Sequence, residues 1–461
     1  MAPKFGTSGL RGLVTELTPP LVRDYTQAFL AACDVSGTVH VGRDLRASSP
    51  RIAGDVIEAI TAAGLDVIDH GPLPTPALAL AALAAEDAAI MVTGSHIPAD
   101  RNGLKFYIAT GEIGKADEAA ILEGLGAETL RPPAGPGRLQ TSLAASVAYR
   151  DRYIGAFGPA ALAGLRIGVY KHSSVARDLM GAVLTGLGAD VVPLARSDSF
   201  VPVDTEAVDA DTRAMLAGWC AEHRLDALVS TDGDADRPMV ADAAGVIVPG
   251  DVLGPLTARR LGADIICTPV SSNTLVDAIG GFKAVRRTRI GSPYVIAAMA
   301  EAAGANVVGY EANGGFLLGF EAVGPAGPIA PLMTRDCLLP IVTPLVAMGE
   351  AGTTLAGLVA ALPQRFTASD RLTDVPTDRS RVWLAAMIEN AEQRCRVLAP
   401  DSDETGLDLT DGLRIHYADG TIVHLRPSGN APEFRCYAEA DSSARAAALL
   451  ATPLAAVART L

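Results

Sequence analysis

The chain has 461 residues, with 52 acidic and 38 basic side chains and a formal net charge of −14. This balance excludes the broad basic surface that a nucleic-acid-binding protein needs, although a cleft in an acidic protein can still bind a small anion. With 49% hydrophobic residues, six cysteines without a CxxC pair and no apolar run of the ~18 residues that span a membrane, the composition is that of a globular protein. We therefore expect a cytoplasmic enzyme of three or four domains that binds neither membranes nor nucleic acids.

Short β-branched runs alternate with Ala- and Leu-rich stretches of helical periodicity along most of the chain. Residues 38–42, for example, predict a strand, and residues 49–64 predict the helix that follows it. Ser49 is the expected N-cap of this helix, Pro50 its first residue and Gly64 its stop. The alternation predicts α/β layers with mostly parallel sheets, whose ligands bind beyond the carboxyl ends of the strands.

Two segments of the first 110 residues contain candidate anion ligands. The first, KFGTSGLRG, offers Ser8 and Arg11. The second is the polar loop TGSH, which follows a predicted strand at residues 88–92 and places Ser95 at an exposed strand end.

Three further polar residues, His96, Arg101 and Lys105, follow Ser95 closely. The simpler interpretation is a polar turn in which Ser95 caps a helix. An esterase loses its main support because the second glycine of the GxSxG motif is missing. A serine flanked by cations instead favours phosphoryl transfer, because Arg and Lys balance the charge of the transferred group.

The predicted strand at residues 226–230 leads into DGDADR, which brings together Asp232, Asp234 and Asp236. Such crowding of carboxylates is unfavourable unless a cation lies among them. Oxygen ligands favour Mg²⁺, Mn²⁺ or Ca²⁺ over zinc. An EF-hand is excluded because Arg237 stands where the loop requires glycine. An acidic, solvated turn is the simpler alternative.

The third such loop, YEANGG, follows a predicted strand at residues 306–309. Its Glu311 and Asn313 can together donate and accept the hydrogen bonds that sugar hydroxyls form. A glycine-rich turn without a function explains the loop equally well. Because three α/β units each present one polar loop, we expect the loops to share a cleft.

The pattern changes after residue 374. A hairpin with Asp-Gly in its turn at residues 412–425, a strand at 433–440 and a closing helix at 443–461 predict a smaller α+β domain. Its loop RPSGNAPEFR is either a plain tight hairpin or an anion site. The candidate ligands in this loop are Arg426, Ser428, Gly429, Asn430 and Arg435.

In this order, the loops resemble those of the α-D-phosphohexomutase superfamily, which includes phosphomannomutases, phosphoglucomutases and phosphoglucosamine mutases. The resemblance covers essentially the whole chain and rests on FGTSGLRG, GRDLRASS, TGSHIPADRNGLK, DGDADR, YEANGG and RPSGNAP. It implies an α/β fold of four domains around a central cleft. Three similar mixed α/β three-layer domains would span residues 1–150, 151–252 and 253–370, and a smaller α+β domain residues 371–461.

The resemblance also implies a role for each candidate residue. Ser95 would be a phosphoserine, and Mg²⁺ would be held by its phosphoryl group and by Asp232, Asp234 and Asp236. Arg11, His96 and Lys105 would be catalytic residues beside Ser95. The residues expected to bind the sugar phosphate are Ser8, Arg237, Glu311, Asn313, Arg426, Ser428, Gly429, Asn430 and Arg435.

The implied reaction interconverts mannose 6-phosphate and mannose 1-phosphate through a hexose 1,6-bisphosphate, in a monomer or homodimer. Phosphoglucomutase, dual-specificity and phosphoglucosamine mutase activities remain alternatives, as do a metal-dependent sugar-phosphate phosphohydrolase and a sugar-phosphate-binding regulator without catalysis. In many bacterial relatives the sugar loop ends in SGH or SAH, whereas Asn313 and Gly315 stand here and no histidine follows. An acid/base role for that histidine is therefore not carried over.

Overall fold

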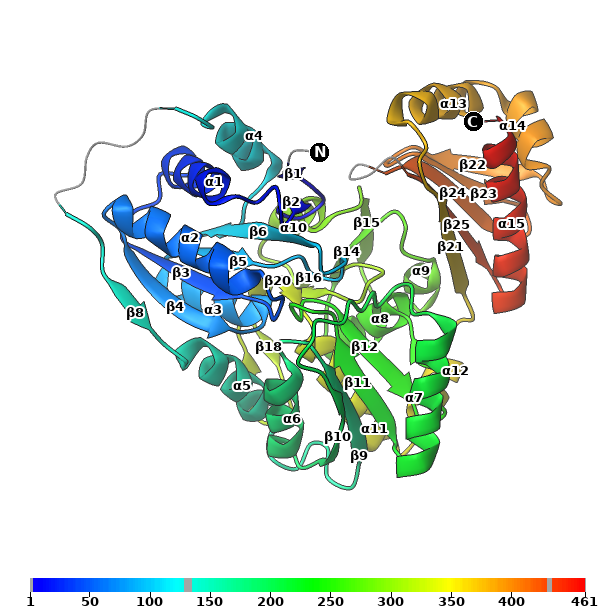
Figure 1. The fold of residues 1–461 in the computed structure, drawn as a ribbon. Helices are drawn as coiled ribbons and strands as arrows, with labels where there is room; N and C mark the ends of the chain where they lie inside the picture. The colour runs from blue at the N-terminus through cyan, green and yellow to red at the C-terminus, as the bar shows by residue number, and fades with distance from the viewer. Residues whose placement is uncertain (1–2, 128–134, 429–432, 461) are drawn as a thin grey trace.

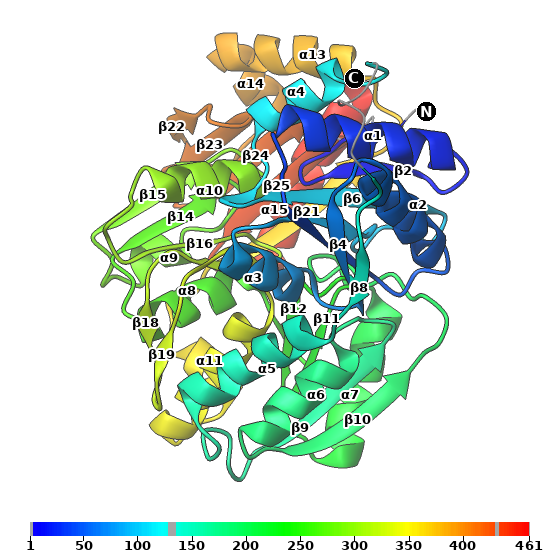
Figure 2. The same ribbon diagram turned by 90° about the vertical axis from the view of Figure 1, so that its left-hand side faces the viewer.

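The computed structural model describes residues 3–127, 135–428 and 433–460. Over these residues the chain folds into four units, each built on its own five- or eight-stranded sheet (Figures 1 and 2). The first three units pack against one another, and the fourth, in orange and red, stands to one side (Figure 1). The predicted architecture, three α/β domains and a smaller α+β domain, is confirmed.

The first domain has the strand order β1-β2-β6-β5-β3-β4-β8, with β7 beside β6. Its strands are β1 (Lys4–Phe5), β2 (Leu10–Leu13), β3 (Thr38–Arg43), β4 (Asp66–Pro72), β5 (Ala88–Val92), β6 (Arg101–Ile108), β7 (Gly111–Glu112) and β8 (Leu139–Thr141). Its helices are α1 (Pro19–Ala32), α2 (Ser49–Ala62), α3 (Thr75–Ala85) and α4 (Lys115–Glu123), and α5 (Ala144–Phe157) leads to the second domain.

Helix α2 begins one residue earlier than the sequence predicts, so that Ser49 is its first residue and Pro50 its second. Its N-cap is Ser48, and the hydroxyl of Ser49 donates instead to the buried carboxylate of Asp44. The prediction of Ser49 as the N-cap is therefore wrong, because its hydroxyl is bound by the carboxylate of Asp44 and does not cap the helix.

The second and third domains repeat the strand pattern β4-β3-β5-β6 of the first. Their sheets have the orders β10-β9-β11-β12-β13 and β15-β14-β16-β17-β20. In each domain three neighbouring strands are parallel and the next is antiparallel. The sheets are thus mixed, not mostly parallel, because the short loops after β5, β11 and β16 cannot make the long crossover that a parallel strand needs.

The second domain contains β9 (Arg166–His172), β10 (Asp190–Arg196), β11 (Ala227–Thr231), β12 (Pro238–Asp242), β13 (Ile247–Val248), α6 (Arg177–Gly186) and α7 (Ala210–His223). The third contains β14 (Ile265–Pro269), β15 (Ala284–Thr288), β16 (Val307–Tyr310), β17 (Phe316–Leu318), β18 (Ala322–Val323), β19 (Pro328–Ile329), β20 (Leu332–Asp336), α8 (Gly250–Arg260), α9 (Leu275–Ala278), α10 (Ser292–Ala300), α11 (Leu338–Ala351) and α12 (Leu355–Ala360).

The fourth domain is an antiparallel sheet of order β21-β25-β24-β23-β22, covered by helices. Its elements are β21 (Phe366–Leu372), β22 (Glu404–Asp408), β23 (Leu413–Tyr417), β24 (Ile422–Pro427), β25 (Phe434–Ala440), α13 (Thr377–Glu389), α14 (Ala391–Leu398) and α15 (Ser443–Thr460). The predicted hairpin, third strand and closing helix are all present. Within the described residues, no helix is long and apolar enough to cross a membrane.

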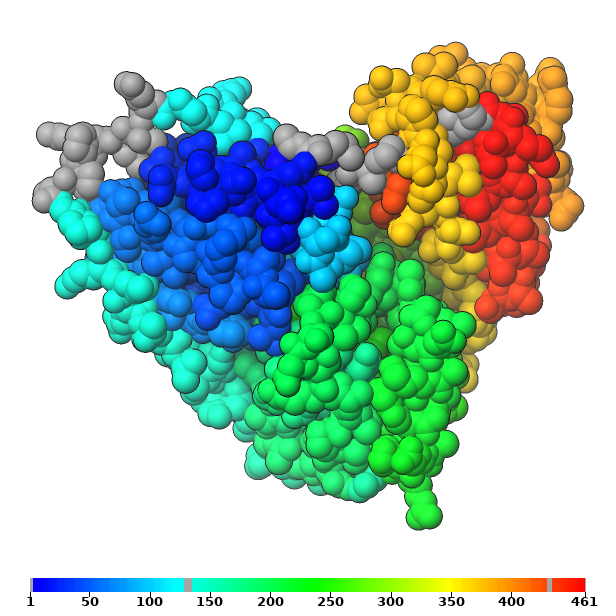
Figure 3. Space-filling view, in the orientation of Figure 1, coloured from blue at the N-terminus to red at the C-terminus, as the bar shows by residue number. Residues whose placement is uncertain are grey.

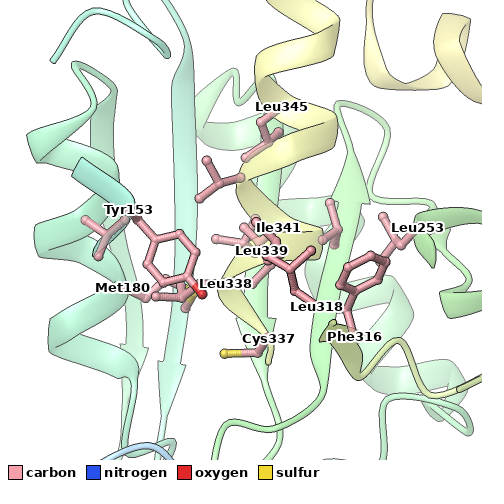
Figure 4. Packing of buried hydrophobic residues seen from close by; sticks show 14 of the residues in the cluster. Tyr153, Met180, Leu253, Phe316, Leu318, Cys337, Leu338, Leu339, Ile341 and Leu345 are labelled. Carbon is pink, nitrogen blue, oxygen red and sulfur yellow. The ribbon is translucent and has the colours of Figure 1, made fainter. Parts of the chain in front are cut away.

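One hydrophobic cluster runs through the first three domains, whereas the fourth has a separate core. Helix α11 lies at the centre of the shared cluster, with Leu338, Leu339 and Ile341 fully buried between Tyr153 on one side and Phe316 on the other (Figure 4). This packing fixes the first three domains relative to one another. A hollow separates the fourth from the first (Figure 3).

Candidate active site

Three polar loops occupy the same topological position in the three α/β domains. The serine loop (93–100) joins β5 to β6, the metal loop (232–237) joins β11 to β12, and the sugar loop (311–315) joins β16 to β17. Contacts between their side chains, described below, bring the loops together as the sequence predicts.

Arg46 holds the serine loop in place. Its guanidinium group is fully buried and donates to the carbonyl oxygens of Ser95 and Ile97 at 2.8 and 2.6 Å, and to that of Pro98 at 2.7 Å. Asp44 accepts from Arg46 Nε at 3.0 Å and offsets its charge. A Cβ atom at Gly94 would lie 2.7 Å from the guanidinium carbon, so this position requires glycine.

Ser95 is buried, which corrects the expectation of an exposed hydroxyl. Its relative exposure is 0%, and its φ is +53°, a conformation that costs a non-glycine residue about 1 kcal/mol or more. Its Oγ donates to Asp232 Oδ2 at 2.7 Å. The helix-cap alternative is wrong, because this hydroxyl faces the metal loop of another domain.

The metal loop places three buried carboxylates side by side. One oxygen each from Asp232, Asp234 and Asp236 lies within 4.8 Å of the others. Lys105 Nζ donates to Asp234 Oδ2 and Asp236 Oδ2, both at 2.6 Å. The solvated-turn alternative is wrong because all three aspartates are buried.

Burial and the two neighbouring carboxylates raise the pKa of Asp232 well above its usual range. Burial also opposes ionisation of Asp236, but Arg335 and Lys105 reverse this effect and lower the pKa of its carboxyl group. The second oxygens of Asp234 and Asp236 are buried and accept no hydrogen bond from any residue in the described parts of the chain. Oxygen atoms in such a setting fit a hard divalent cation.

Arg335 links the metal and sugar loops and was missed in the sequence. Its Nη2 lies 2.7 Å from Asp236 Oδ2, and its Nη1 donates to Glu311 Oε2 at 3.1 Å. It also approaches Ser8 Oγ at 3.4 Å, while Ser8 donates to Glu112 at 2.6 Å. Arg335 stands in a strand without motif residues around it, so only the fold reveals its position.

The sugar loop has less free polar surface than its sequence indicates. Glu311 is engaged by Arg335, and Asn313 Oδ1 accepts the backbone N–H of Gly315 at 2.9 Å. Both side chains are buried, at 5% and 7% relative exposure. The loop is therefore fixed by its own hydrogen bonds.

The basic side chains expected around Ser95 differ in charge and in position. Arg11 is half-buried, and burial together with Arg237 and Arg335 lowers its pKa to about 10, so it stays charged near neutral pH. His96 Nδ1 lies 3.3 Å from Ser95 Oγ, and burial beside Arg237 and Arg11 holds the pKa of its imidazole far below the usual value. Arg101, expected beside Ser95, is exposed instead and interacts with Glu16.

In the fourth domain, two candidate phosphate ligands are neighbours. Arg426 and Arg435 are paired across β24 and β25. Arg426 Nη2 lies 3.5 Å from Asp411 Oδ2, and the N–H of Ser428 donates to the carbonyl of Glu433 at 2.8 Å. Gly429 and Asn430 lie outside the described residues.

The comparisons with known proteins agree across the whole chain. Models described as phosphoglucomutase/phosphomannomutase, alpha/beta/alpha domains I, II and III and C-terminal domain, match residues 2–131, 151–245, 249–366 and 372–456. A phosphomannomutase of Sinorhizobium fredii is 46% identical over 469 aligned positions, covering 99% of this chain and 98% of the relative. A phosphomannomutase of Salmonella muenchen is 44% identical and covers 98% and 94%.

A solved structure shares the fold. It is that of a phosphoglucomutase/phosphomannomutase family protein from Burkholderia thailandensis, 22% identical, with a TM-score of 0.76 over 98% of this chain and 97% of that one. Because four domain models match and two relatives exceed 40% identity, the shared ancestry does not depend on any single motif. The chain belongs to the phosphoglucomutase/phosphomannomutase family.

Proposed function

We propose that this phosphohexomutase is a Mg²⁺-dependent phosphomannomutase, which interconverts mannose 6-phosphate and mannose 1-phosphate through a hexose 1,6-bisphosphate. Two relatives with that name, alignable over almost their whole length, support the choice of mannose. The observation that carries the mechanism is the 2.7 Å hydrogen bond from Ser95 Oγ to Asp232, which joins a hydroxyl to a carboxylate cluster.

In the proposed reaction, Ser95 carries a phosphoryl group. The free hydroxyl of the hexose phosphate attacks its phosphorus, the bond from phosphorus to Ser95 Oγ breaks, and a bond to the sugar oxygen forms. The sugar hydroxyl loses a proton and Ser95 Oγ gains one. After the bisphosphate turns end for end, Ser95 attacks the other phosphoryl group and the same bonds change in reverse.

The carboxylates of Asp232, Asp234 and Asp236, with an oxygen of the phosphoryl group on Ser95, would hold the metal ion. Bound there, Mg²⁺ supplies positive charge that offsets the charge on the transferred group. The unpartnered oxygens of Asp234 and Asp236 support this assignment. Arg11 and Lys105 would polarise the attacking hydroxyl, and His96 would contact Ser95 as a neutral imidazole.

The phosphate that is not transferred would bind Arg426, Ser428, Gly429, Asn430 and Arg435. Two arginines on neighbouring strands form a suitable site, because guanidinium groups bind phosphate oxygens in pairs. Glu311 and Asn313 would bind the sugar, with Ser8 and Arg237 at the margin of the site. Binding the remote phosphate positions the reacting hydroxyl.

One assay separates this proposal from its alternatives. The protein is supplied with mannose, glucose or glucosamine 1-phosphate, Mg²⁺ and a trace of hexose 1,6-bisphosphate, and both isomer formation and inorganic phosphate release are measured. We expect the 6-phosphate isomer without net phosphate release. Release of phosphate at the rate of substrate loss would identify a phosphohydrolase, and a preference for glucosamine 1-phosphate would reject mannose.

The metal assignment has its own test. Asp234→Asn removes one negative ligand, so we expect calorimetric titration to show Mg²⁺ binding weakened by about 10-fold or more. Asp178→Asn, at an exposed aspartate on α6, should bind Mg²⁺ like the wild type. Unchanged affinity in Asp234→Asn would show that the cluster does not hold the ion.

A further inference from the structure

A segment of the second domain without helix or strand, residues 199–207, extends from β10 toward the three loops. The ring of Phe200 lies 3.9 Å from the guanidinium carbon of Arg46, which holds the serine loop. The same ring packs against the metal loop, since a Cβ at Gly233 would lie 2.9 Å from it. Through this side chain the segment therefore contacts the metal loop and the arginine that holds the serine loop.

The far end of this segment contacts the third loop. Thr205 Oγ1 donates to the carbonyl oxygen of Asn313 at 3.1 Å. Asp204 accepts the N–H of Glu206 at 3.1 Å, which shapes a local turn. Val201 and Val203 also fix the segment: the N–H of Val201 donates to Ser173 Oγ at 2.7 Å, and Val203 is buried. Glu206 thus has a defined position beside the sugar loop.

The carboxylate of Glu206 interacts electrostatically with charged groups of the second, third and fourth domains. These are Arg237 of the metal loop, Asp204 of its own segment, Glu311 of the sugar loop and Arg435 of the fourth domain. Loss of hydration around the carboxylate, more than the neighbouring carboxylates of Asp204 and Glu311, raises the pKa of Glu206 to about 7. The residue as a whole remains exposed to solvent. Among the described residues its carboxylate accepts no hydrogen bond.

A carboxylate beside the sugar loop, with Arg237 and Arg435 in its electrostatic surroundings, has a clear chemical use. It accepts hydrogen bonds from sugar hydroxyls, and when protonated it also donates one. The two sugar-loop side chains that would bind the sugar each already make one such contact, Glu311 with Arg335 and Asn313 with Gly315, which leaves them fewer free positions for sugar hydroxyls. We propose that Glu206, presented by residues 199–207, is a further substrate-binding residue that contacts the hydroxyls of the hexose.

This inference rests on the proposed function, and its test compares Glu206→Gln with Glu222→Gln, at an exposed glutamate on α7. We expect Glu206→Gln to raise the KM for mannose 1-phosphate about 10-fold, with kcat changed less than ~3-fold, because a charged acceptor is replaced by a weaker neutral one. The same loss should appear as a weaker calorimetric affinity for mannose 1-phosphate in a Ser95→Ala background. Glu222→Gln should match the wild type.

Inhibition by inorganic phosphate distinguishes a sugar contact from a general disturbance of the site. Glu206→Gln should bind inorganic phosphate at least as tightly as the wild type, since a negative charge is removed from an anion site. An unchanged KM and affinity for mannose 1-phosphate, or equal weakening of inorganic phosphate, would overturn the inference. Failure of the wild type to convert any hexose phosphate would instead reject the proposed function.

Discussion

Arg46 shows how a fully buried side chain can position a reacting residue. The motif around it was visible in the sequence, but its bonds to three carbonyls of a loop 49 or more residues away were not. Lysine presents a single ammonium group and cannot make these contacts in their several directions. Arg46→Lys should therefore lower kcat by about 100-fold, the scale of a misplaced reacting group.

The control for this prediction is Arg51→Lys, at a half-exposed arginine paired with Asp55 on α2. It should keep its kcat, because a surface ion pair contributes little. Measured turnover of both variants, with circular dichroism to confirm folding, decides the point. A folded Arg46→Lys protein with normal kcat would show that the serine loop holds its shape unaided.

His172 gives the second domain a predictable sensitivity to acid. Its Nε2 is bonded to the carbonyl of Thr231 at 2.8 Å, and burial lowers its pKa to about 4. Because the unfolded chain binds a proton near pH 6.5 and the folded chain does not, this residue's contribution is complete above pH 6.5 and falls as the pH drops toward 4. By pH 5 the loss is about 2 kcal/mol.

Urea unfolding at pH 7 and pH 5 measures this effect. His172→Asn keeps a residue that tolerates the positive φ of +22° at this site. We expect the variant to lose less stability between the two pH values than the wild type does, whatever its stability at pH 7. An equal loss in both proteins would mean that other groups cause the acid sensitivity.

At the level of single residues, the sequence predicted those that stand in motifs and missed those that do not. Ser95 and the three aspartates follow strands in recognisable loops, and Lys105 lies in the strand directly after the serine loop. Arg335 and Glu206 have no such context, because one lies in a strand and the other in an irregular segment. Their neighbours are set by the packing of separate domains, which local patterns do not encode.

At the level of elements, α5 joins the first domain to the third through a buried acid. Tyr149 OH donates to Asp336 Oδ1 at 2.6 Å, and Tyr153 donates to the other oxygen. Asp336 also accepts the N–H of Leu338 at the start of α11. Tyr153→Phe should therefore destabilise the protein by ~1.5–3 kcal/mol, the cost of a hydrogen bond to a charged group.

A matched comparison is Tyr107→Phe, which removes a buried hydroxyl that lies 3.4 Å from the neutral partner Thr334. Its cost should be smaller, ~0.5–1.5 kcal/mol. Denaturant unfolding of both variants gives the difference. If Tyr153→Phe is the less costly of the two, the link from α5 to Asp336 does not stabilise the domain arrangement.

The sequence predicted strand positions well and strand directions less well. Strand β5 and the strands of the last domain were predicted because a short hydrophobic run with turn residues at both ends is too short for a helix. Whether a strand runs parallel or antiparallel to its neighbour depends on the connection between them, which is either a long crossover or a short hairpin loop. The loops after β5, β11 and β16 were recognised as functional, but not as the returns that make β6, β12 and β17 antiparallel.

At the level of the whole molecule, the end-for-end turn of the intermediate limits how selective the cleft can be. Mannose and glucose phosphates differ only at O2, and the turn moves O2 relative to a fixed sugar loop. A side chain that hydrogen-bonds O2 in one orientation of the sugar has no partner in the other orientation. Leaving such a buried polar group unpaired costs ~1–3 kcal/mol of binding free energy. We expect mannose and glucose 1-phosphates to be used within about two orders of magnitude in kcat/KM.

Steady-state kinetics with both sugars, using the wild type and Asn313→Ala, tests this limit. The variant should be impaired with both substrates, because its loop would lose the hydrogen bond to Gly315 that fixes it. Rejection of glucose 1-phosphate by more than about 10⁴-fold would require a dedicated contact to O2.

Labelling with radioactive phosphate shows whether Ser95 carries the transferred phosphoryl group. The protein is incubated with hexose 1,6-bisphosphate bearing radioactive phosphate, digested, and mapped by mass spectrometry, alongside Ser95→Ala. We expect the label on Ser95, its transfer to unlabelled mannose 1-phosphate as the bisphosphate, and turnover in Ser95→Ala reduced by about 10⁴-fold or more. Label on another residue, or substantial turnover in the folded Ser95→Ala protein, would show that Ser95 does not carry the transferred phosphoryl group.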